Sequence, residues 1–293
     1  MQYELQNGCL IEYYENGNKK EEKWYKDGQL HRENGPALIK YYKDGRIQSE
    51  EWYRHGKLHR DNSPAVEEYD SSGNICHQYY YSEGKIVKEV IFIKTGAEQQ
   101  PSIRMEKEYY SNGQLLGKVW YKNNRLHRED GPAVIFYSFN GKISKEVWYR
   151  NGKIHRDDGP AEIDYYDNGR TAQEKWYKYG ELQREDGPAW IKYYPDGTKA
   201  EERWYKGVFL HNEKGPAFIR YYEDGKRKEE LWIKEGQFHR EDGPAVIQYS
   251  PDGGKLEKKY YINGKEITEK EHYLYQKLNK QLGRIKQTKK ISL

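Results

Sequence analysis

The sequence has very little cysteine and no long apolar run. Its 293 residues include 2 Cys, and hydrophobic residues make up only 35%. Cys9 and Cys76 lie far apart and outside any usual metal-ligand spacing, which argues against a disulfide scaffold and favours a reducing compartment. No stretch approaches the ~20 apolar residues of a membrane span. The N-terminus also lacks the basic and apolar regions of a signal peptide. We therefore expect a soluble, cytoplasmic protein.

Charge of one sign is also missing, although charged residues are abundant. The chain has 51 basic and 47 acidic residues, a formal net charge of +4, and the two signs alternate along it. A nucleic-acid-binding protein normally gathers its basic residues on one face or in one block, so we expect no nucleic-acid partner. The only basic stretch, residues 284–290, is interpreted as a solvated, frayed terminus.

Aromatic residues are plentiful where other apolar residues are scarce. The 30 Tyr and 8 Trp exclude the disordered class, because disordered chains are poor in aromatics. Tryptophan recurs at a spacing of 28 residues or, once, of 68. The series is Trp24, Trp52, Trp120, Trp148, Trp176, Trp204 and Trp232. A fixed period of this length is the signature of a repeat architecture.

Each repeat has the pattern of a β-hairpin. Residues 36–42 are short and rich in β-branched and aromatic side chains, which predicts a strand. Asp44-Gly45 supplies the positive φ angles of a tight turn, residues 50–53 form the return strand, and residues 58–64 cross over to the next repeat. The sequence therefore predicts an all-β fold: an elongated array of about nine antiparallel hairpins in one twisted sheet over residues 1–266.

The two faces of the predicted sheet differ in how strictly their residues recur. Ala37, Ile39 and Tyr41 share one face, and the same three residue types recur there in later repeats. We call this the uniform face and expect it to be packed. The other, variable face is expected to be exposed or adapted to a partner. One of its equivalent positions is occupied by Leu38, Val66, Val134, Glu162, Trp190 and Phe218. The tryptophan series lies beside the uniform face, which favours core stacking over a platform for bases or sugars.

One repeat is longer than the others. Trp120 follows Tyr80 by 40 residues rather than 28, and Val87-Lys88 stands where other repeats have His-Arg. The extra residues are placed near 88–104, around residues 95–101. Insertions in repeat proteins emerge on one face and are sometimes functional. A tolerated surface excursion is the simpler interpretation.

The last segment, residues 267–293, changes to a helical pattern and ends in the basic tail. Thr268 with Glu271 three residues later forms a capping box. Leu274, Leu278 and Leu282 fall on one helical face. We expect a short amphipathic helix over residues 268–282 that caps the last strand by covering its open edge. Docking on a partner helix is the alternative.

The repeated pattern W-Y-x-x-G-x-L-H-R-x-D-G-P-A-x-I-x-Y-Y-x-D-G resembles the MORN repeat (membrane occupation and recognition nexus), in its longer bacterial and viral variant. Residues 120–141 and 232–253 show it well, and the resemblance extends over residues 3–265. The family's usual unit is shorter, and Arg here replaces the Gly that follows the His. Similar long versions are familiar from large DNA viruses of protists and from bacteria.

The resemblance implies a non-enzymatic scaffold with an extended surface for protein–protein interaction. Membrane-surface or anionic-ligand binding is one alternative, because lipid binding is sometimes attributed to the family, and antitoxin-like inhibition of a single partner protein is another. Enzymes with such repeats carry their chemistry in a separate domain, and no motif for one is found. We expect no cofactor and no metal.

The recurrent His-Arg-x-Asp/Asn is the strongest chemical motif, as in His127-Arg128-Glu129-Asp130. An imidazole beside a carboxylate could act as a general base or bind metal, but a catalytic site is normally built once. A structural ladder in which Arg pairs with Asp explains the repetition better, so no catalytic residue is assigned. The residues considered for binding are Arg128, Arg156 and Arg240, for an anionic partner, and the single-copy Trp190 and Phe218.

Overall fold

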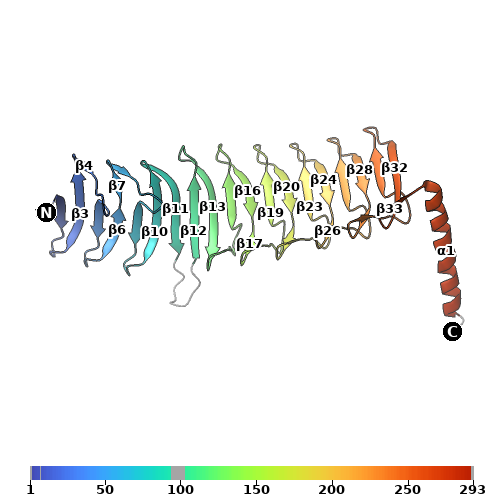
Figure 1. The fold of residues 1–293 in the computed structure, drawn as a ribbon, viewed down its shortest axis with the longest axis horizontal. Coiled ribbons are helices and arrows are strands. Elements are labelled where there is room, and N and C mark those ends of the chain that lie inside the picture. The colour runs from blue at the N-terminus through green and yellow to red at the C-terminus, as the bar shows by residue number, and fades with distance from the viewer. Residues whose placement is uncertain (1, 7, 94–102, 292–293) are drawn as a thin grey trace. The chain divides into compact units, whose positions relative to one another are not determined.

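The computed structural model describes residues 2–6, 8–93 and 103–291, with side chains from residue 8 to residue 282 in that part (Figure 1). It consists of antiparallel hairpins and a single C-terminal helix, which confirms the predicted fold class. The predicted extra segment around residues 95–101 lies outside the described residues. Two compact units are present, residues 1–152 and residues 153–293.

In the first unit, each main strand pairs antiparallel with the next along the chain. These strands are β1 (Gln2–Gln6), β2 (Cys9–Tyr13), β3 (Lys19–Lys26), β5 (Leu38–Tyr41), β6 (Ile47–Glu51), β9 (Val66–Tyr69), β10 (Ile75–Ser82), β11 (Lys85–Ile93), β12 (Ile103–Tyr109), β13 (Leu115–Lys122), β15 (Val134–Tyr137) and β16 (Ile143–Val147). Two-residue strands form short side ribbons: β4 (Gln29–Leu30), β7 (Tyr53–Arg54), β8 (Lys57–Leu58), β14 (Arg125–Leu126) and β17 (Tyr149–Arg150).

The second unit follows the same plan and adds the helix. Its main strands are β19 (Glu162–Tyr165), β20 (Thr171–Lys175), β23 (Trp190–Tyr193), β24 (Lys199–Arg203), β27 (Phe218–Tyr221), β28 (Arg227–Leu231), β31 (Val246–Tyr249) and β32 (Lys255–Ile262). Its short elements are β18 (Lys153–Ile154), β21 (Tyr177–Lys178), β22 (Glu181–Leu182), β25 (Tyr205–Lys206), β26 (Phe209–Leu210), β29 (Ile233–Lys234), β30 (Gln237–Phe238) and β33 (Lys265–Ile267), before α1 (Glu269–Ile291).

Two kinds of turn shape the repeats, and glycine occurs in most of them, whereas Asn123 and Asn124 adopt the positive φ angles between β13 and β14. After β5, Tyr42 N donates to Arg46 O (2.8 Å) and Gly45 adopts φ 90°. The short β7–β8 ribbon turns at His55 (φ 48°) and Gly56 (φ 72°). Two successive positive φ angles define a type I′ turn, whose twist matches that of the flanking strands. The x-Gly pairs of the sequence therefore fix where most repeats fold back.

The uniform face is packed, as predicted. All seven alanines of this face are completely buried at 0% exposure. They are Ala37, Ala65, Ala133, Ala161, Ala189, Ala217 and Ala245. Ala37 also joins neighbouring strands, because its N donates to Glu51 O and its O accepts from Trp24 N, each at 2.8 Å.

The prediction that the variable face is exposed is wrong at its most variable position. Leu38, Val134 and Phe218 are only 6%, 8% and 5% exposed. Around them run cross-strand ion pairs, such as Lys40 Nζ to Glu51 Oε1 at 2.8 Å. The alkyl stems of such long side chains cover apolar neighbours while their charged ends stay in water. A single sheet thus buries part of both faces.

Strand β11 is an additional full strand in place of the His-Arg crossover loop. It pairs with β10 on one side and β12 on the other, whereas β6 pairs directly with β9. One extra strand in an antiparallel sheet reverses the direction of every strand that follows. Within the first unit, Figure 1 accordingly shows the short strands β4 and β7 along one edge and β17 along the opposite edge.

The same reversal moves the uniform face to the other side of the sheet. Directly paired residues share a face, and one such row runs through Glu67, Gln78, Val90, Glu106 and Val119. Glu67 lies on the uniform face of its repeat, two residues after Ala65. Val119 pairs with Val134, which lies on the variable face. Each broad face of the first unit therefore combines a uniform part with a variable part.

Helix α1 begins with the predicted capping box but runs on through the predicted frayed segment to Ile291. Glu271 N donates to Thr268 Oγ1 (3.2 Å), and Thr268 N donates to Glu271 Oε2 (2.7 Å). The expected packing of its leucines is wrong: Leu274, Leu278 and Leu282 are 54%, 56% and 47% exposed.

Polar side chains dock helix α1 instead. The buried His272 ring contacts Arg240 O through Nε2 (3.1 Å), and Gln276 Nε2 donates to Glu241 O (2.9 Å). Both carbonyls belong to the last crossover loop, so His272 and Gln276 set which side of the helix faces that loop.

Candidate functional site: the crossover ladder and its breaks

The histidines of the crossover motif link each repeat to the next. In six repeats the His Nδ1 accepts a hydrogen bond from the backbone N of the positive-φ turn residue 24 positions later, at 3.0–3.4 Å. The pairs are His31–His55, His59–Glu83, His127–Asn151, His155–Tyr179, His211–Glu235 and His239–Asn263. Because Nδ1 accepts, the ring proton of the neutral imidazole is on Nε2. In His155 this Nε2 lies 3.1 Å from Asp157 Oδ1. Both ring nitrogens of His155 are therefore occupied structurally.

Crossover arginines pack on the tryptophan of their own repeat. The Cζ atoms of Arg128 and Arg240 lie 4.2 Å and 3.7 Å from the ring centroids of Trp120 and Trp232, the geometry of a cation–π contact. Among the described residues, Arg32, Arg60 and Arg184 cover Trp24, Trp52 and Trp176 in the same way, at 3.9–4.2 Å. Arginine, rather than a neighbouring tryptophan, therefore covers these rings.

The guanidinium is held from its edges as well. Arg128 Nε donates to Asp130 Oδ1 of the same repeat (2.9 Å), and Nη1 donates to Pro132 O (3.4 Å). A side chain at Gly131 would place its Cβ 3.2 Å from Arg128 Cζ. The Asp-Gly-Pro segment thus accommodates the arginine that replaces the family's glycine. Its Asp and Pro accept hydrogen bonds from the guanidinium group, and its Gly leaves room for that group.

We expect the histidine link to contribute measurably to stability. His127→Ala removes the acceptor of Asn151 N at a position only 9% exposed, which should lower the free energy of unfolding by about 1–2 kcal/mol. Urea unfolding followed by far-UV circular dichroism measures it. Lys57→Ala, at an exposed ribbon position, is the control and should change stability by less than about 0.5 kcal/mol. Equal effects of the two substitutions would contradict the ladder.

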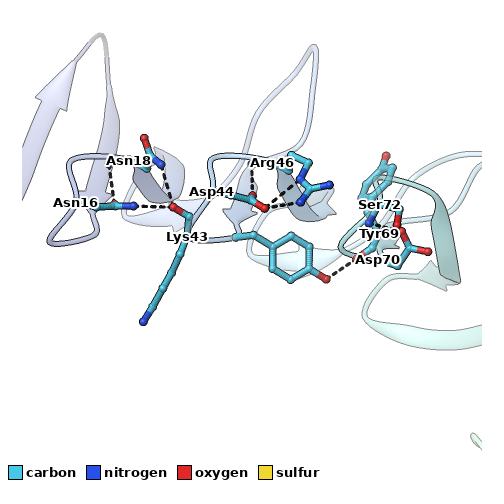
Figure 2. A network of polar contacts seen from close by, with 9 residues as sticks. Asn16, Asn18, Lys43, Asp44, Arg46, Tyr69, Asp70 and Ser72 are labelled. Carbon is cyan, nitrogen blue, oxygen red and sulfur yellow. Dashed lines mark hydrogen bonds and ion pairs between the residues drawn. The ribbon is translucent and has the colours of Figure 1, made fainter.

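Tyrosines provide a further link between neighbouring turns. In six places the hydroxyl of one repeat donates to the backbone carbonyl of a tyrosine 27 residues later, as Tyr42 does to Tyr69 O at 2.7 Å. Figure 2 shows this bond beside turn-to-turn contacts such as Asn16 Nδ2 to Lys43 O (2.8 Å). These turn groups therefore bond to one another rather than to a ligand.

The residues considered for binding are built into the array. Arg128 and Arg240 make the contacts above, and Arg156 donates to Asp158 Oδ1 (2.8 Å). Phe218 is buried, with the Arg203 and Arg220 guanidinium groups 5.5 Å and 5.2 Å from its ring. Trp190 is half-buried; its Nε1 donates to Gln173 Oε1 (3.0 Å) and Arg203 lies over its ring at 4.2 Å. Their role in binding stays a prediction.

A groove of about 480 Å³ separates two crossover loops in the second unit. It is lined by the basic Arg156, Lys178 and Arg184 and by the acidic Asp157, Asp158, Glu185 and Asp186, among others. Since acidic side chains match the basic ones there, the groove does not attract anions selectively.

Three exposed apolar residues interrupt the polar turns of the second unit. Tyr179, Val208 and Phe209 are 54%, 83% and 55% exposed. These residues were not predicted from the sequence, although the order of residues at the turns indicates them. The equivalent turns of other repeats read x-Gly followed by a polar residue, as in Glu235-Gly236-Gln237, whereas Gly207-Val208-Phe209 breaks that order.

One single-copy cluster combines side chains that ligate metals. Glu68 on β9 and Cys76 and His77 on β10 place their ligand atoms within 4.8 Å of one another. From the sequence, Cys76 was compared only with Cys9 as a possible ligand, and the adjacent His77 was not recognised.

The fold and ladder define a repeat protein built from β-hairpins that hydrogen-bond to their successors. Within this class, residues 6–27 and 105–123 match the MORN repeat variant, which confirms the resemblance. MORN repeats generally mediate interactions with proteins or membrane lipids and are typically non-catalytic. The described part of the chain contains no helix that is long and apolar enough to cross a membrane.

Other comparisons add little. No curated protein matches the chain. Among solved structures, a chain of the crystal structure of TcdB2-TccC3-Cdc42 is 13% identical, with 88% of this chain and 17% of that chain covered, at a TM-score of 0.15. The corresponding values for TcdB2-TccC3-TEV are 12%, 87%, 16% and 0.15. The chain thus spans about a sixth of the length of those chains.

Proposed function

We propose that the protein is a non-enzymatic scaffold that binds a protein partner through Tyr179, Val208 and Phe209. The observation that carries this proposal is their exposure, 54%, 83% and 55%, at turns that are otherwise polar. Apolar and aromatic side chains anchor protein interfaces. Val208 and Phe209 are not among the histidine-linked pairs, and the ladder is complete in repeats that lack such side chains.

Two of these side chains are already held in place. The Tyr179 ring stacks on His155, with centroids 4.2 Å apart and planes at 12°. Phe209 lies against the next turn, so closely that a Cβ at Gly236 would be 3.0 Å from its Cδ1. Anchors fixed before binding lose less entropy when a partner arrives. Such a patch suits one tightly bound protein partner, as for an antitoxin-like inhibitor. If the source is viral, this partner would be found in the host cytoplasm.

The proposal predicts that charge at these turns abolishes binding without loss of fold. Val208→Asp combined with Phe209→Glu should reduce affinity for the partner at least tenfold, because both introduced carboxylates would lose their hydration in the interface. Affinity purification from the native source, followed by titration of the recovered partner, measures it. Glu235→Asp with Gln237→Glu, at the same turn of the next repeat, is the matched control. Undiminished capture by the folded double variant would overturn the proposal.

Membrane binding through the arginine ladder is less well supported. Each ladder arginine is accompanied by acidic residues, and in the first unit the reversal at β11 places Arg32 and Arg128 near opposite edges. Helix α1 favours a membrane more, since its exposed Tyr273, Leu274 and Leu278 adjoin Lys277 and Lys280. An apolar stripe beside lysines is typical of helices that lie on anionic bilayers.

Vesicle sedimentation separates these alternatives. With phosphatidylserine vesicles, membrane binding by α1 predicts salt-sensitive sedimentation that Leu278→Asp abolishes. Binding by the ladder predicts loss with Arg128→Ala, Arg156→Ala and Arg240→Ala together. The protein-scaffold proposal predicts that neither surface causes sedimentation with the vesicles. Sedimentation that persists after Val208 and Phe209 are replaced would favour membrane binding.

A further inference from the structure

We propose that Glu68, Cys76 and His77 form a zinc-binding site. The three side chains lie on the paired strands β9 and β10 of the first unit, and their ligand atoms are all within 4.8 Å of one another. His77 Nδ1 is 3.5 Å from Glu68 Oε2. Around a tetrahedral zinc with bonds of 2.0–2.3 Å, ligand atoms are roughly 3.3–3.8 Å apart. Small side-chain rotations therefore suffice to close the site.

A β-bulge explains how neighbours on one strand come together. Successive residues of a regular strand point to opposite faces, which would separate Cys76 from His77. The pairing of β10 with β9 instead shifts register between Ile75 and His77, so Cys76 is the extra residue of a bulge. Its Sγ lies 3.3 Å from Glu68 O, on the strand that also carries the Glu68 carboxylate.

The histidine has a free ring nitrogen aimed at the cluster. His77 Nδ1 is buried and has no hydrogen-bond partner in the described part of the chain, because its approach to Glu68 is too long for a good hydrogen bond. The ring is held by stacking on Tyr79, at a centroid distance of 6.0 Å and an interplanar angle of 10°. The crossover histidines differ, since their Nδ1 atoms accept backbone hydrogen bonds. An unpaired, oriented imidazole nitrogen is suited to bind a metal.

The donor set selects zinc among common ions. A thiolate, an imidazole and a carboxylate are all zinc ligands, whereas calcium and magnesium prefer oxygen ligands alone. Three protein ligands leave the fourth tetrahedral position for water or a ligand from a partner. The Glu68 and His77 side chains are 43% and 33% exposed, which leaves the site accessible.

This chemistry occurs in one repeat although the bulge occurs in many. The equivalent bulges of β6, β20 and β24 shift register at the same place. Their pairs equivalent to Cys76-His77 are Gln48-Ser49, Ala172-Gln173 and Ala200-Glu201. The scaffold thus supplies the geometry in each of these repeats, but among the described residues the full set of ligands occurs only here, in the repeat that precedes the inserted strand β11. Repetition argues for structure, and this single occurrence argues for a specific role.

Metal titration of the full-length protein tests the proposal. With Zn²⁺ and a chromophoric competitor we expect one tight site per chain, and with Co²⁺ an intense thiolate-to-metal absorption band. Cys76→Ser and His77→Ala should each weaken binding more than about 100-fold, beyond the 10–100-fold typical of residues that only orient a ligand. Glu68→Gln should weaken it and keep the cobalt–thiolate band. Cys9→Ser and His59→Ala are the matched controls and should bind as the wild type does.

Two outcomes would overturn the proposal. One is zinc binding that Cys76→Ser leaves unchanged while far-UV circular dichroism shows the variant folded. The other is the absence of a cobalt–thiolate band in the wild type, which would identify any bound metal as adventitious. Neither readout depends on a partner, so the site and the scaffold function are tested separately.

Discussion

Raising the pH through 10 to 12 is expected to unfold the array. Burial, together with the hydrogen bond to Glu89 (2.9 Å), raises the pKa of Tyr109 from its ordinary value of 10.0 to about 12. Burial also raises the pKa of Tyr41 and Tyr221, with contributions from Glu22 and Glu202. A raised folded pKa means that the stabilisation is complete below pH 10 and is lost as the pH rises through the folded pKa. Because such tyrosines recur, their losses add.

Urea unfolding at a series of pH values, together with the ultraviolet absorbance of tyrosinate, measures this loss. Tyr109→Phe is the informative variant. It removes a hydroxyl whose protonated state stabilises the fold, so it should be less stable than the wild type at neutral pH. The difference should shrink between pH 10 and about 12, where the wild type loses the same contribution. A difference that stays constant over this range would show that Tyr109 does not titrate with unfolding.

The period and alternation of the sequence predict the repeating parts well because local chemistry determines them. Asp44-Gly45 and His55-Gly56 define their turns through positive φ angles. Alternation then assigns Ala37 and Ile39 to the packed face. The capping box at Thr268 and Glu271 satisfies exposed amides at the helix start whatever the helix packs against.

The parts that were missed depend on contacts between distant residues. Residues 85–93 become a full strand because β10 and β12 pair with both of its edges, and such preferences depend on context more than on composition. The leucines of α1 indicate an apolar stripe but not what covers it, and the helix docks through His272 and Gln276 instead. Cys76 and His77 are neighbours in the sequence, but it is the β-bulge that brings their side chains together. The spacing of the ligand residues does not predict that bulge.

Replacing Glu202 is expected to destabilise the second unit strongly. This carboxylate is only 6% exposed, yet it accepts hydrogen bonds from the Tyr221 hydroxyl and from Lys199 Nζ. Glu202→Ala leaves both donors without their partner. Breaking a buried pair typically costs about 3–5 kcal/mol, and we expect about 3 kcal/mol because the Lys199 side chain is half exposed.

Two further variants separate the hydrogen bonds from the charge. Glu202→Gln keeps an acceptor for Tyr221 and removes only the charge, so it should cost clearly less than Glu202→Ala in urea unfolding. Glu181→Ala, at an exposed ribbon position of the same unit, should change stability by less than about 0.5 kcal/mol. The equivalent Glu22 and Glu174 accept the hydroxyls of Tyr41 and Tyr193 in the same way. If Glu202→Ala proved neutral, the inner tyrosine–glutamate bonds would not stabilise the array, and strand pairing, the histidine links and apolar packing would have to hold its repeats together.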